Sequence, residues 1–174
     1  MNILLDFDGT CSGGHSKGRF FNESVPMDKE NQILFIDSAN AWLNAGHNVS
    51  IITRGIGTKI GPYFTNILGI PFISGGFQQG IVSIFAPDED TFNAHPGPDF
   101  WADEKLLYVK RFLDCSESWS AKTIFVDDTL INVTKMQLEF PDMKCVHVEN
   151  FGDYQFTFQT VTEFLTDSAT INYT

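Results

Sequence analysis

Apolar residues in this chain form short runs separated by polar segments, and their spacing follows two periods. Runs rich in β-branched and aromatic residues predict strands, and between them apolar residues recur at helical spacing. The predicted strands cover 2–5, 48–53, 70–74, 81–86, 122–127 and 144–148, and the predicted helices cover 28–45, 59–68, 103–113, 133–138 and 157–165. Strand, helix and strand in succession make a βαβ unit, whose strands are parallel. The pattern therefore predicts an α/β fold.

Three segments depart from this alternation. Residues 11–26 are rich in Gly and Ser and carry His15, Lys17 and Arg19, which predicts a flap or loop beside the first strand. Residues 75–98 change in character, and we interpret them as a small insertion in which the run 81–86 is half of a hairpin or an edge element. The tail 166–174 is polar and is expected to be frayed.

The composition is that of one globular domain. The chain has 174 residues, of which 43% are hydrophobic and 19% charged, so we expect a single domain over 1–174 with a core rich in its 17 phenylalanines. A formal net charge of −11 argues against binding to nucleic-acid polymers or anionic membranes. Three cysteines without CxxC spacing indicate reduced thiols, and the lack of a signal-like or membrane-spanning segment predicts a cytoplasmic protein.

The first predicted strand leads into two acidic residues, Asp6 and Asp8, followed by Gly9 and Thr10. A turn after Asp6 splays the two carboxylates toward one ligand, and a divalent cation relieves their repulsion. The alternative is a plain acidic turn, since Asp-x-Asp-Gly occurs in many loops. Cys11 follows this motif, but nothing in the sequence pairs it with an activating His, so we interpret it as a small loop residue.

Two other predicted strands end in residues that can bind a phosphate group or a metal ion. The strand 48–53 ends at Thr53, followed by Arg54, and the strand 122–127 ends at Asp127, followed by Asp128. The carboxyl ends of parallel strands meet at one rim of a sheet, which is where ligands bind in such folds. A hydroxyl and the free N–H groups of a Gly-containing turn suit a phosphate oxygen. Phosphate and metal ligands are therefore expected to gather at this rim.

These motifs resemble those of the haloacid dehalogenase (HAD) superfamily of phosphatases and phosphotransferases. The resemblance covers most of the chain, from residue 3 to about 148, and rests on motifs rather than on continuous similarity. The matching segments are Asp-Phe-Asp-Gly-Thr at 6–10, Ile-Ile-Thr at 51–53, a lysine in the helix 103–113 and Phe-Val-Asp-Asp-Thr at 125–129. It implies a three-layer Rossmann-like domain with a central, mostly parallel sheet of about five strands and helices on both faces.

The resemblance also implies catalytic roles. Asp6 would attack phosphorus to form an aspartyl-phosphate, and Asp8 would act as general acid and then as general base. Thr53 and a lysine would hold the phosphoryl oxygens, with Arg54 adding a positive charge. Lys105 fits the lysine position better than Lys110, which is the alternative.

A magnesium site is implied as well. Its ligands would be Asp6, the backbone carbonyl of Asp8 and Asp128, with Asp127 close behind them. Asn132 stands where many members of the superfamily carry a further carboxylate. Because the ligands are all oxygen atoms, with no His or Cys in the motifs, Mg²⁺ is favoured over zinc.

We therefore expect a Mg²⁺-dependent phosphomonoester hydrolase whose substrate is a small phosphorylated metabolite or a nucleotide. The alternatives are a phosphotransferase of the same superfamily and a non-catalytic metal- or phosphate-binding module. A receiver-type signalling domain has similar residues in a different order. The chain has no room for a large cap, so the site is either open or covered by a second copy of the chain in a homodimer. Phe20, Phe21 and Trp101 are candidates for stacking on a base, with core packing as the alternative.

Overall fold

A six-stranded parallel sheet forms the centre of the computed structural model, which describes residues 1–13, 27–95, 97–116 and 119–171. The strand order is β3-β4-β2-β1-β5-β6, and every adjacent pair is parallel. The strands are β1 (Asn2–Leu5), β2 (Asn48–Ile52), β3 (Phe72–Ser74), β4 (Val82–Phe85), β5 (Thr123–Asp127) and β6 (Lys144–His147). The predicted α/β fold is confirmed, with six strands rather than about five.

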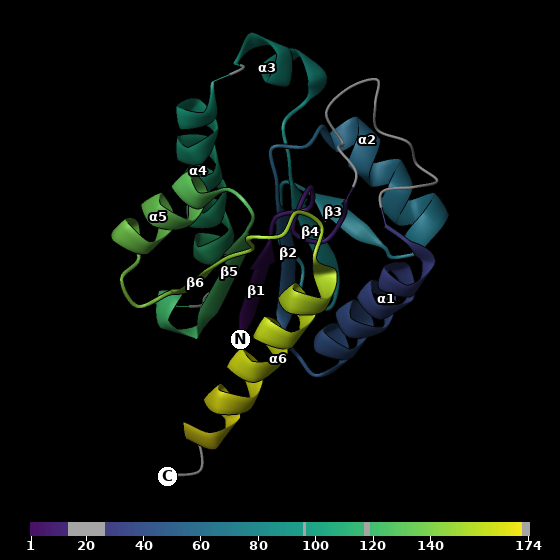
Figure 1. Ribbon diagram of the computed structural model, residues 1–174, viewed down its shortest axis with the longest axis vertical. Coiled ribbons are helices and arrows are strands. Elements are labelled where there is room, and N and C mark those ends of the chain that lie inside the picture. Colours follow the sequence, from purple (N-terminus) through teal and green to yellow (C-terminus); the bar gives the residue numbers. More distant parts are fainter. Residues whose placement is uncertain (14–26, 96, 117–118, 172–174) are drawn as a thin grey trace.

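Helices cover both faces of the sheet, as predicted (Figure 1). On one face lie α1, α2 and α6, and on the other α4 and α5. The helices are α1 (Lys29–Asn44), α2 (Gly57–Pro62), the π-helical turn η1 (Tyr63–Leu68), α3 (Glu89–Ala94), α4 (Pro98–Ser116), the 3₁₀ turn η2 (Ser120–Lys122), α5 (Leu130–Glu139) and α6 (Tyr154–Ile171). The structure thus has three layers.

Alternation along β1 divides the core between the two faces. Ile3 and Leu5 pack with the helices α1 and α6, whereas Leu4 packs with α4 and α5. All three side chains are fully buried, as expected for a strand that is covered on both sides. The part of the core on the side of α1 and α6 is rich in aromatic rings. Phe35 and Tyr154 form one such pair, with ring centroids 5.3 Å apart. The predicted aromatic core is present.

The position of β4 corrects the interpretation of 81–86. This strand is neither an edge element nor half of a hairpin, because it lies between β3 and β2 and is parallel to both. Parallel neighbours usually need a long crossover, but β3 is so short that the connection 75–81 suffices. The segment 75–98 therefore supplies a strand of the sheet as well as α3.

Two helix boundaries also differ from the prediction. Helix α4 begins at Pro98 rather than at 103, because proline is well suited to the first position of a helix. Lys105 therefore lies beyond the first turn of α4, whereas the predicted range 103–113 implies a position near the start of the helix. Helix α6 begins at Tyr154 and continues to Ile171, so most of the tail that was expected to be frayed is helical.

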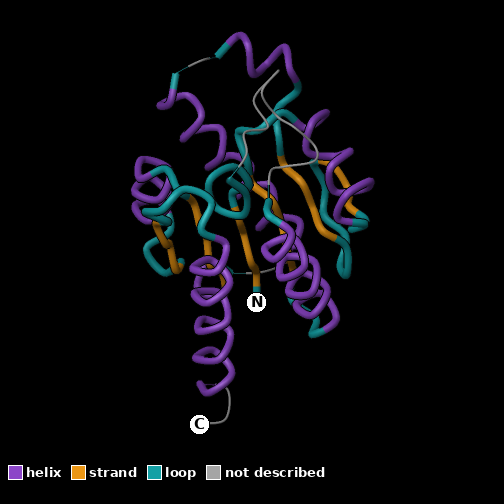
Figure 2. The backbone as a smooth tube through the Cα atoms, turned by 45° about the vertical axis from the view of Figure 1, so that its right-hand side comes forward, coloured by secondary structure: helices purple, strands orange, loops and turns teal. Residues whose placement is uncertain are grey.

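The order of the strands places the predicted chemistry at one rim. β1 lies between β2 and β5, with Leu5 in register with Ile51 and Val126. The residues that follow these three strands therefore meet at the carboxyl end of the sheet. Helix α3 and the start of α4 rise above this end (Figures 1 and 2). Among the described residues, no helix is both long enough and apolar enough to cross a membrane.

Candidate active site

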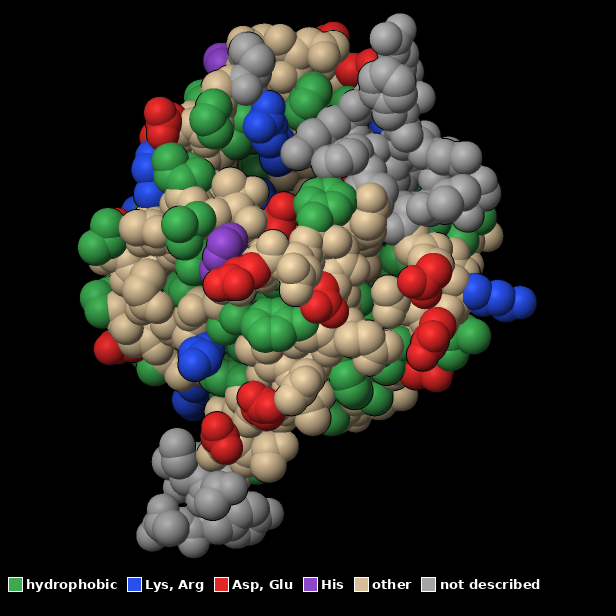
Figure 3. Space-filling model, viewed as in Figure 1, with side chains coloured by type: hydrophobic (Ala, Val, Ile, Leu, Met, Phe, Trp, Pro, Cys, Tyr) green, Lys and Arg blue, Asp and Glu red, His purple; other side chains and the backbone are tan. Residues whose placement is uncertain are grey.

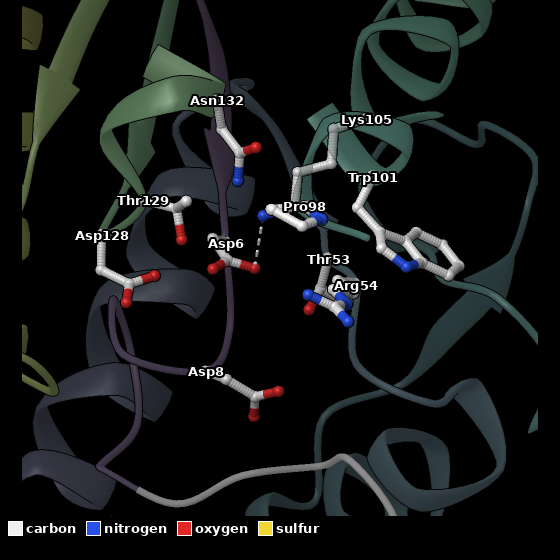
Figure 4. Close-up of a pocket in the computed structure, with 10 residues that line it drawn as sticks. All are labelled: Asp6, Asp8, Thr53, Arg54, Pro98, Trp101, Lys105, Asp128, Thr129 and Asn132. Carbon is white, nitrogen blue, oxygen red and sulfur yellow. Dashed lines mark ion pairs between the residues drawn. The ribbon is translucent and has the colours of Figure 1, made fainter. Parts of the chain in front are cut away.

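A small pocket of about 40 Å³ lies at the carboxyl end of the sheet. It contains six of the seven residues predicted for the site, and the seventh, Asp127, lies directly behind it in contact with Lys105. The lining residues are Asp6, Asp8, Thr53, Arg54, Pro98, Trp101, Lys105, Asp128, Thr129 and Asn132 (Figure 4). Elements separated by more than 100 residues in the sequence are thus brought into one cavity.

The turn after β1 fixes the two acids of the first motif. The backbone N–H of Asp6 donates to Val126 O at 2.9 Å, so the end of β1 remains attached to β5. Phe7 O then accepts hydrogen bonds from the backbone N–H groups of both Cys11 and Ser12, which closes the turn. The Cys11 thiol is buried and donates to Asp6 O at 3.2 Å. Burial raises the pKa of this thiol, which suits a protonated structural residue.

Gly9 allows the turn after β1 to pack closely against Asp128, which follows β5. The φ of Gly9 is +87°, a conformation that glycine adopts without strain. A Cβ atom at this position would lie 2.4 Å from Asp128 Oδ2, well inside van der Waals contact. A side chain at this position would therefore force Asp128, Phe151 or the turn itself to move.

Lys105 is enclosed between two carboxylates. Its Nζ lies 3.0 Å from Asp6 Oδ1 and 2.5 Å from Asp127 Oδ2, and its side chain is almost fully buried. Burial alone disfavours the charged ammonium, but attraction to Asp127 and Asp6 outweighs it and raises the pKa of Lys105. Lys110, the alternative position, instead forms an ion pair with Glu139 at a half-exposed surface.

Asp127 is saturated with hydrogen bonds. Besides Lys105, it accepts one from the backbone N–H of Thr129 at 2.8 Å and two from the Asn132 amide at 3.1 Å. Burial raises the pKa of Asp127 to about 6 even though Lys105 opposes the shift, so the carboxylate is ionised at neutral pH. Asn132 therefore supports Asp127 as a donor, where a carboxylate would add a further negative charge.

Three carboxylates are close enough to share one cation. Oxygen atoms of Asp6, Asp127 and Asp128 lie within 4.8 Å of one another, and in the part of the chain that the structure describes this group does not include the carboxylate of Asp8. An all-oxygen donor set suits a hard cation such as Mg²⁺. Burial, together with the charges of Asp6 and Asp127, raises the pKa of Asp128 to about 7. A divalent cation would relieve this repulsion, so the residues fit the predicted metal.

The Thr53 hydroxyl lies in the pocket with its hydrogen available for donation. The backbone N–H of Thr53 donates to Phe85 O at 3.0 Å, and its hydroxyl oxygen accepts from the backbone N–H of Gly55 at 2.9 Å. Because the oxygen is an acceptor in this contact, the hydroxyl hydrogen is left to be donated elsewhere. The side chain is fully buried and lines the pocket.

Arg54 lies beside Thr53 and rests on aromatic rings. Its guanidinium carbon is 5.3 Å from the centroid of the Phe92 ring and 5.6 Å from that of Trp101, which are cation–π distances. On the face of the molecule shown in Figure 3, basic atoms are visible in the hollow beneath α3, with an acidic side chain just below them. The helix α3 and the start of α4 thus hold a positive charge at the pocket.

Trp101 forms a wall of the pocket. It is only 1% exposed, and its indole N–H donates to His95 O. Phe100 packs edge-on against it, at 5.1 Å between ring centroids. The burial of the Trp101 ring favours the core-packing alternative over stacking on a base. Phe20 and Phe21, with the rest of the flap from 14 to 26, lie outside the described residues.

Two lining residues escaped the sequence reasoning. Pro98 and Thr129 were not assigned to the site, although both line it. The signal for Pro98 was available, since a proline that precedes a polar, helix-forming segment is typical of a first helical position. Thr129 acts through its backbone N–H, which donates to Asp127, and a backbone contact of this kind leaves no trace in residue type.

Comparison with known proteins supports the fold. No protein-family model and no curated protein matches the chain. A similar solved structure is the crystal structure of the N-terminal part of the protein BF1531 from Bacteroides fragilis, which contains a phosphatase domain complexed with Mg. The TM-score is 0.58 at 16% sequence identity, and the match covers 95% of this chain but 39% of that one. The chain has the fold of that domain.

Removal of the Lys105 charge should destabilise the protein strongly. Lys105→Met leaves Asp6 and Asp127 buried without their counter-ion, so the free energy of unfolding should fall by about 3–5 kcal/mol. Lys110→Met breaks only the half-exposed pair with Glu139 and should cost at most about 1 kcal/mol. Urea unfolding at pH 7 in EDTA compares the two variants, and equal losses would contradict the assigned role of Lys105.

Binding of Mg²⁺ should depend on pH. The metal requires ionised Asp128, whose pKa is about 7, so protons compete with the cation below that pH. The apparent affinity should be level above pH 7 and fall by up to about tenfold for each pH unit below it. Calorimetric titration with Mg²⁺ from pH 5.5 to 8.5 measures this dependence. An affinity that is constant across the range would show that Asp128 does not exchange a proton for the metal.

Proposed function

We propose that the protein is a Mg²⁺-dependent phosphomonoester hydrolase of the HAD type, with Asp6 as its nucleophile. The observation that carries this proposal is the placement of Asp6, which directly follows β1 and lies beside Lys105 and the carboxylates of Asp127 and Asp128. The order of the four motifs along the chain supports it. The fold shared with a Mg²⁺-bound phosphatase domain is consistent with it.

The charges of the pocket match a metal and a phosphate ester. When all four are ionised, the carboxylates of Asp6, Asp8, Asp127 and Asp128 exceed the two cations, Lys105 and Arg54, by two negative charges. A divalent cation cancels this excess. Without it, a phosphate dianion would be repelled by the acids that must react with it. The site is therefore expected to bind the metal first and the ester afterwards.

Lys105 orients the nucleophile. Its ammonium is held by Asp6 Oδ1 and by Asp127, so its charge is already balanced before substrate binds. This contact fixes the orientation of the Asp6 carboxylate, one oxygen of which attacks phosphorus. Asp127 acts behind Lys105 and holds it in place. In this arrangement the lysine positions Asp6 as much as it binds the phosphoryl group.

The reaction proceeds by two displacements at phosphorus. A carboxylate oxygen of Asp6 forms a bond to phosphorus while the ester P–O bond breaks, and Asp8 donates a proton to the departing oxygen. A water molecule, deprotonated by the same Asp8, then attacks the aspartyl-phosphate and releases phosphate and free Asp6. Bound Mg²⁺ would supply charge neutralisation throughout, held by Asp6, Asp128 and the Asp8 backbone. Thr53 and Arg54 hold the phosphoryl oxygens.

The size of the pocket limits what it holds. A volume of about 40 Å³ accommodates a phosphoryl group, so the rest of the substrate must lie outside, near α3 and the start of α4. We therefore propose a small phosphorylated metabolite or a nucleotide as substrate, with its leaving group outside the described pocket. A phosphotransferase would share the aspartyl-phosphate and differ only in its acceptor.

Phosphate release from para-nitrophenyl phosphate and a panel of nucleoside monophosphates tests the function. We expect turnover that needs Mg²⁺, is lost in EDTA, and falls by at least about a thousandfold in Asp6→Asn, because the nucleophile is gone. Asp8→Asn should lose about 10²–10⁴-fold, the usual contribution of a general acid. Asp103→Asn, an exposed aspartate on the same helix as Lys105, is the matched control and should retain full activity.

Three outcomes would overturn the proposal. Undiminished turnover in Asp6→Asn would exclude the aspartyl-phosphate. No turnover on any ester, with Mg²⁺ bound, would favour the non-catalytic module. Phosphorylation of an added alcohol in preference to water would identify the phosphotransferase.

Arg54 and Phe92 should act as one unit in phosphate binding. Arg54→Lys removes the planar guanidinium, which can donate two parallel hydrogen bonds to a phosphate, and should weaken inorganic phosphate binding about tenfold. Phe92→Leu removes a ring under the guanidinium and should weaken it severalfold, as expected for about 1 kcal/mol of cation–π energy. Phe92→Leu should have little further effect in the Arg54→Lys background. Calorimetry in Mg²⁺ measures this cycle, with Phe77→Leu as a control at a ring that packs on Phe112. Additive losses would refute the coupling.

A further inference from the structure

The turn that follows Asp8 is held from outside by the start of α6. Two consecutive carbonyls of this turn accept hydrogen bonds from residues almost 150 positions later in the chain. The backbone N–H of Gly152 donates to Gly9 O at 2.6 Å, and the Thr157 hydroxyl donates to Thr10 O at 2.9 Å. The Thr157 side chain is fully buried. Its hydroxyl lies farther, at 3.3 Å, from the carbonyl of Asp153 in its own helix, so the contact with the turn is the shorter one.

The turn after Asp8 and the segment before α6 are tightly packed against each other. Gly152 has a φ of +80°, and a Cβ there would lie 2.8 Å from Gly13 Cα. A Cβ on Gly9 would lie 2.6 Å from Phe151 Cδ2 and 2.4 Å from Asp128 Oδ2. Asp128 and Phe151 therefore both pack closely against the turn at Gly9. A movement of the turn must alter its contact with Asp128.

The start of α6 is rigid enough to serve as a support. The Tyr154 hydroxyl and Ser38 Oγ lie 2.5 Å apart, which ties α6 to α1, and both residues are buried. Asp153 caps the helix by accepting from the backbone N–H of Phe156 at 3.0 Å. Figure 1 shows α6 beside α1, with its beginning near the carboxyl end of β1.

We propose that Thr157 is a positioning residue of the active site, which acts through the turn 9–10. By holding Thr10 O, together with Gly152 at Gly9 O, it keeps the Asp8 backbone and Asp128 in the geometry that the metal and the reaction need. Asp8 begins the same turn, since it forms a bridge with Ser12, whose carbonyl accepts from Gly9 N at 2.7 Å. This inference rests on the proposed function for its kinetic consequence, but not for its effect on metal binding.

Three variants test the proposal. Thr157→Val keeps the shape and removes the hydroxyl, whereas Thr157→Ser keeps the hydroxyl. Thr162→Val makes the same change in the same helix, at a hydroxyl that donates to Phe158 O within the helix, and is the matched control. The measurements are kcat and KM for para-nitrophenyl phosphate, calorimetric Mg²⁺ affinity and the thermal midpoint.

We expect Thr157→Val to lower kcat by roughly ten- to a hundredfold, the scale of a small misplacement of reacting groups, with KM for the ester nearly unchanged. Its Mg²⁺ affinity should fall severalfold, because the turn contacts Asp128. Thr157→Ser should restore most of both properties, and Thr162→Val should match the wild type in both.

A purely structural role makes a different prediction. If Thr157→Val lowers only the thermal midpoint, while kcat and Mg²⁺ affinity equal those of Thr162→Val, the positioning role is refuted. A Thr157→Ser variant as impaired as the valine would refute the role of the hydroxyl. If the wild type hydrolyses no ester, the proposed function fails, and the Mg²⁺ affinities alone decide the positioning role.

Discussion

The buried contact of Lys105 with Asp6 and Asp127 is the interaction on which the site depends. An ammonium and two carboxylates are costly to bury separately, and they are tolerated here because each satisfies the others at 2.5–3.0 Å. The group joins the ends of β1 and β5 to the helix α4. Its remaining excess of negative charge, increased by Asp128, makes the pocket receptive to a divalent cation.

The parallel sheet makes this contact possible. With β1 between β2 and β5, the residues after three strands meet at one rim, and α4 crosses close enough for Lys105 to reach them. The turn after β1 then has to pack against both Asp128 and the beginning of α6. Glycine at position 9 permits this approach, since any side chain would collide with Asp128. The C-terminal helix thereby becomes part of the support of the acidic turn.

The region above the rim contributes charge and enclosure. Helix α3 and the start of α4 bring Phe92 and Trp101 under the guanidinium of Arg54, so the cation is held over the pocket by rings. Trp101 is buried and forms one wall of the pocket. Under the proposed function, this small pocket holds the phosphoryl group, and selection among substrates depends on what lies outside it.

The sequence by itself determined the α/β fold and the residues of the rim, because strand period, turn residues and acidic motifs are local signals. It favoured Lys105 over Lys110, but only the tertiary structure placed Lys105 between two carboxylates. Only the tertiary structure, likewise, showed that β4 pairs with a strand on each side, because this pairing depends on the strand order rather than on the residues of β4. The contact of Thr157 with Thr10 O left no trace in the sequence, since a hydroxyl that bonds a distant backbone carbonyl looks like any other threonine. Long-range contacts of this kind are decided by packing, which no local pattern encodes.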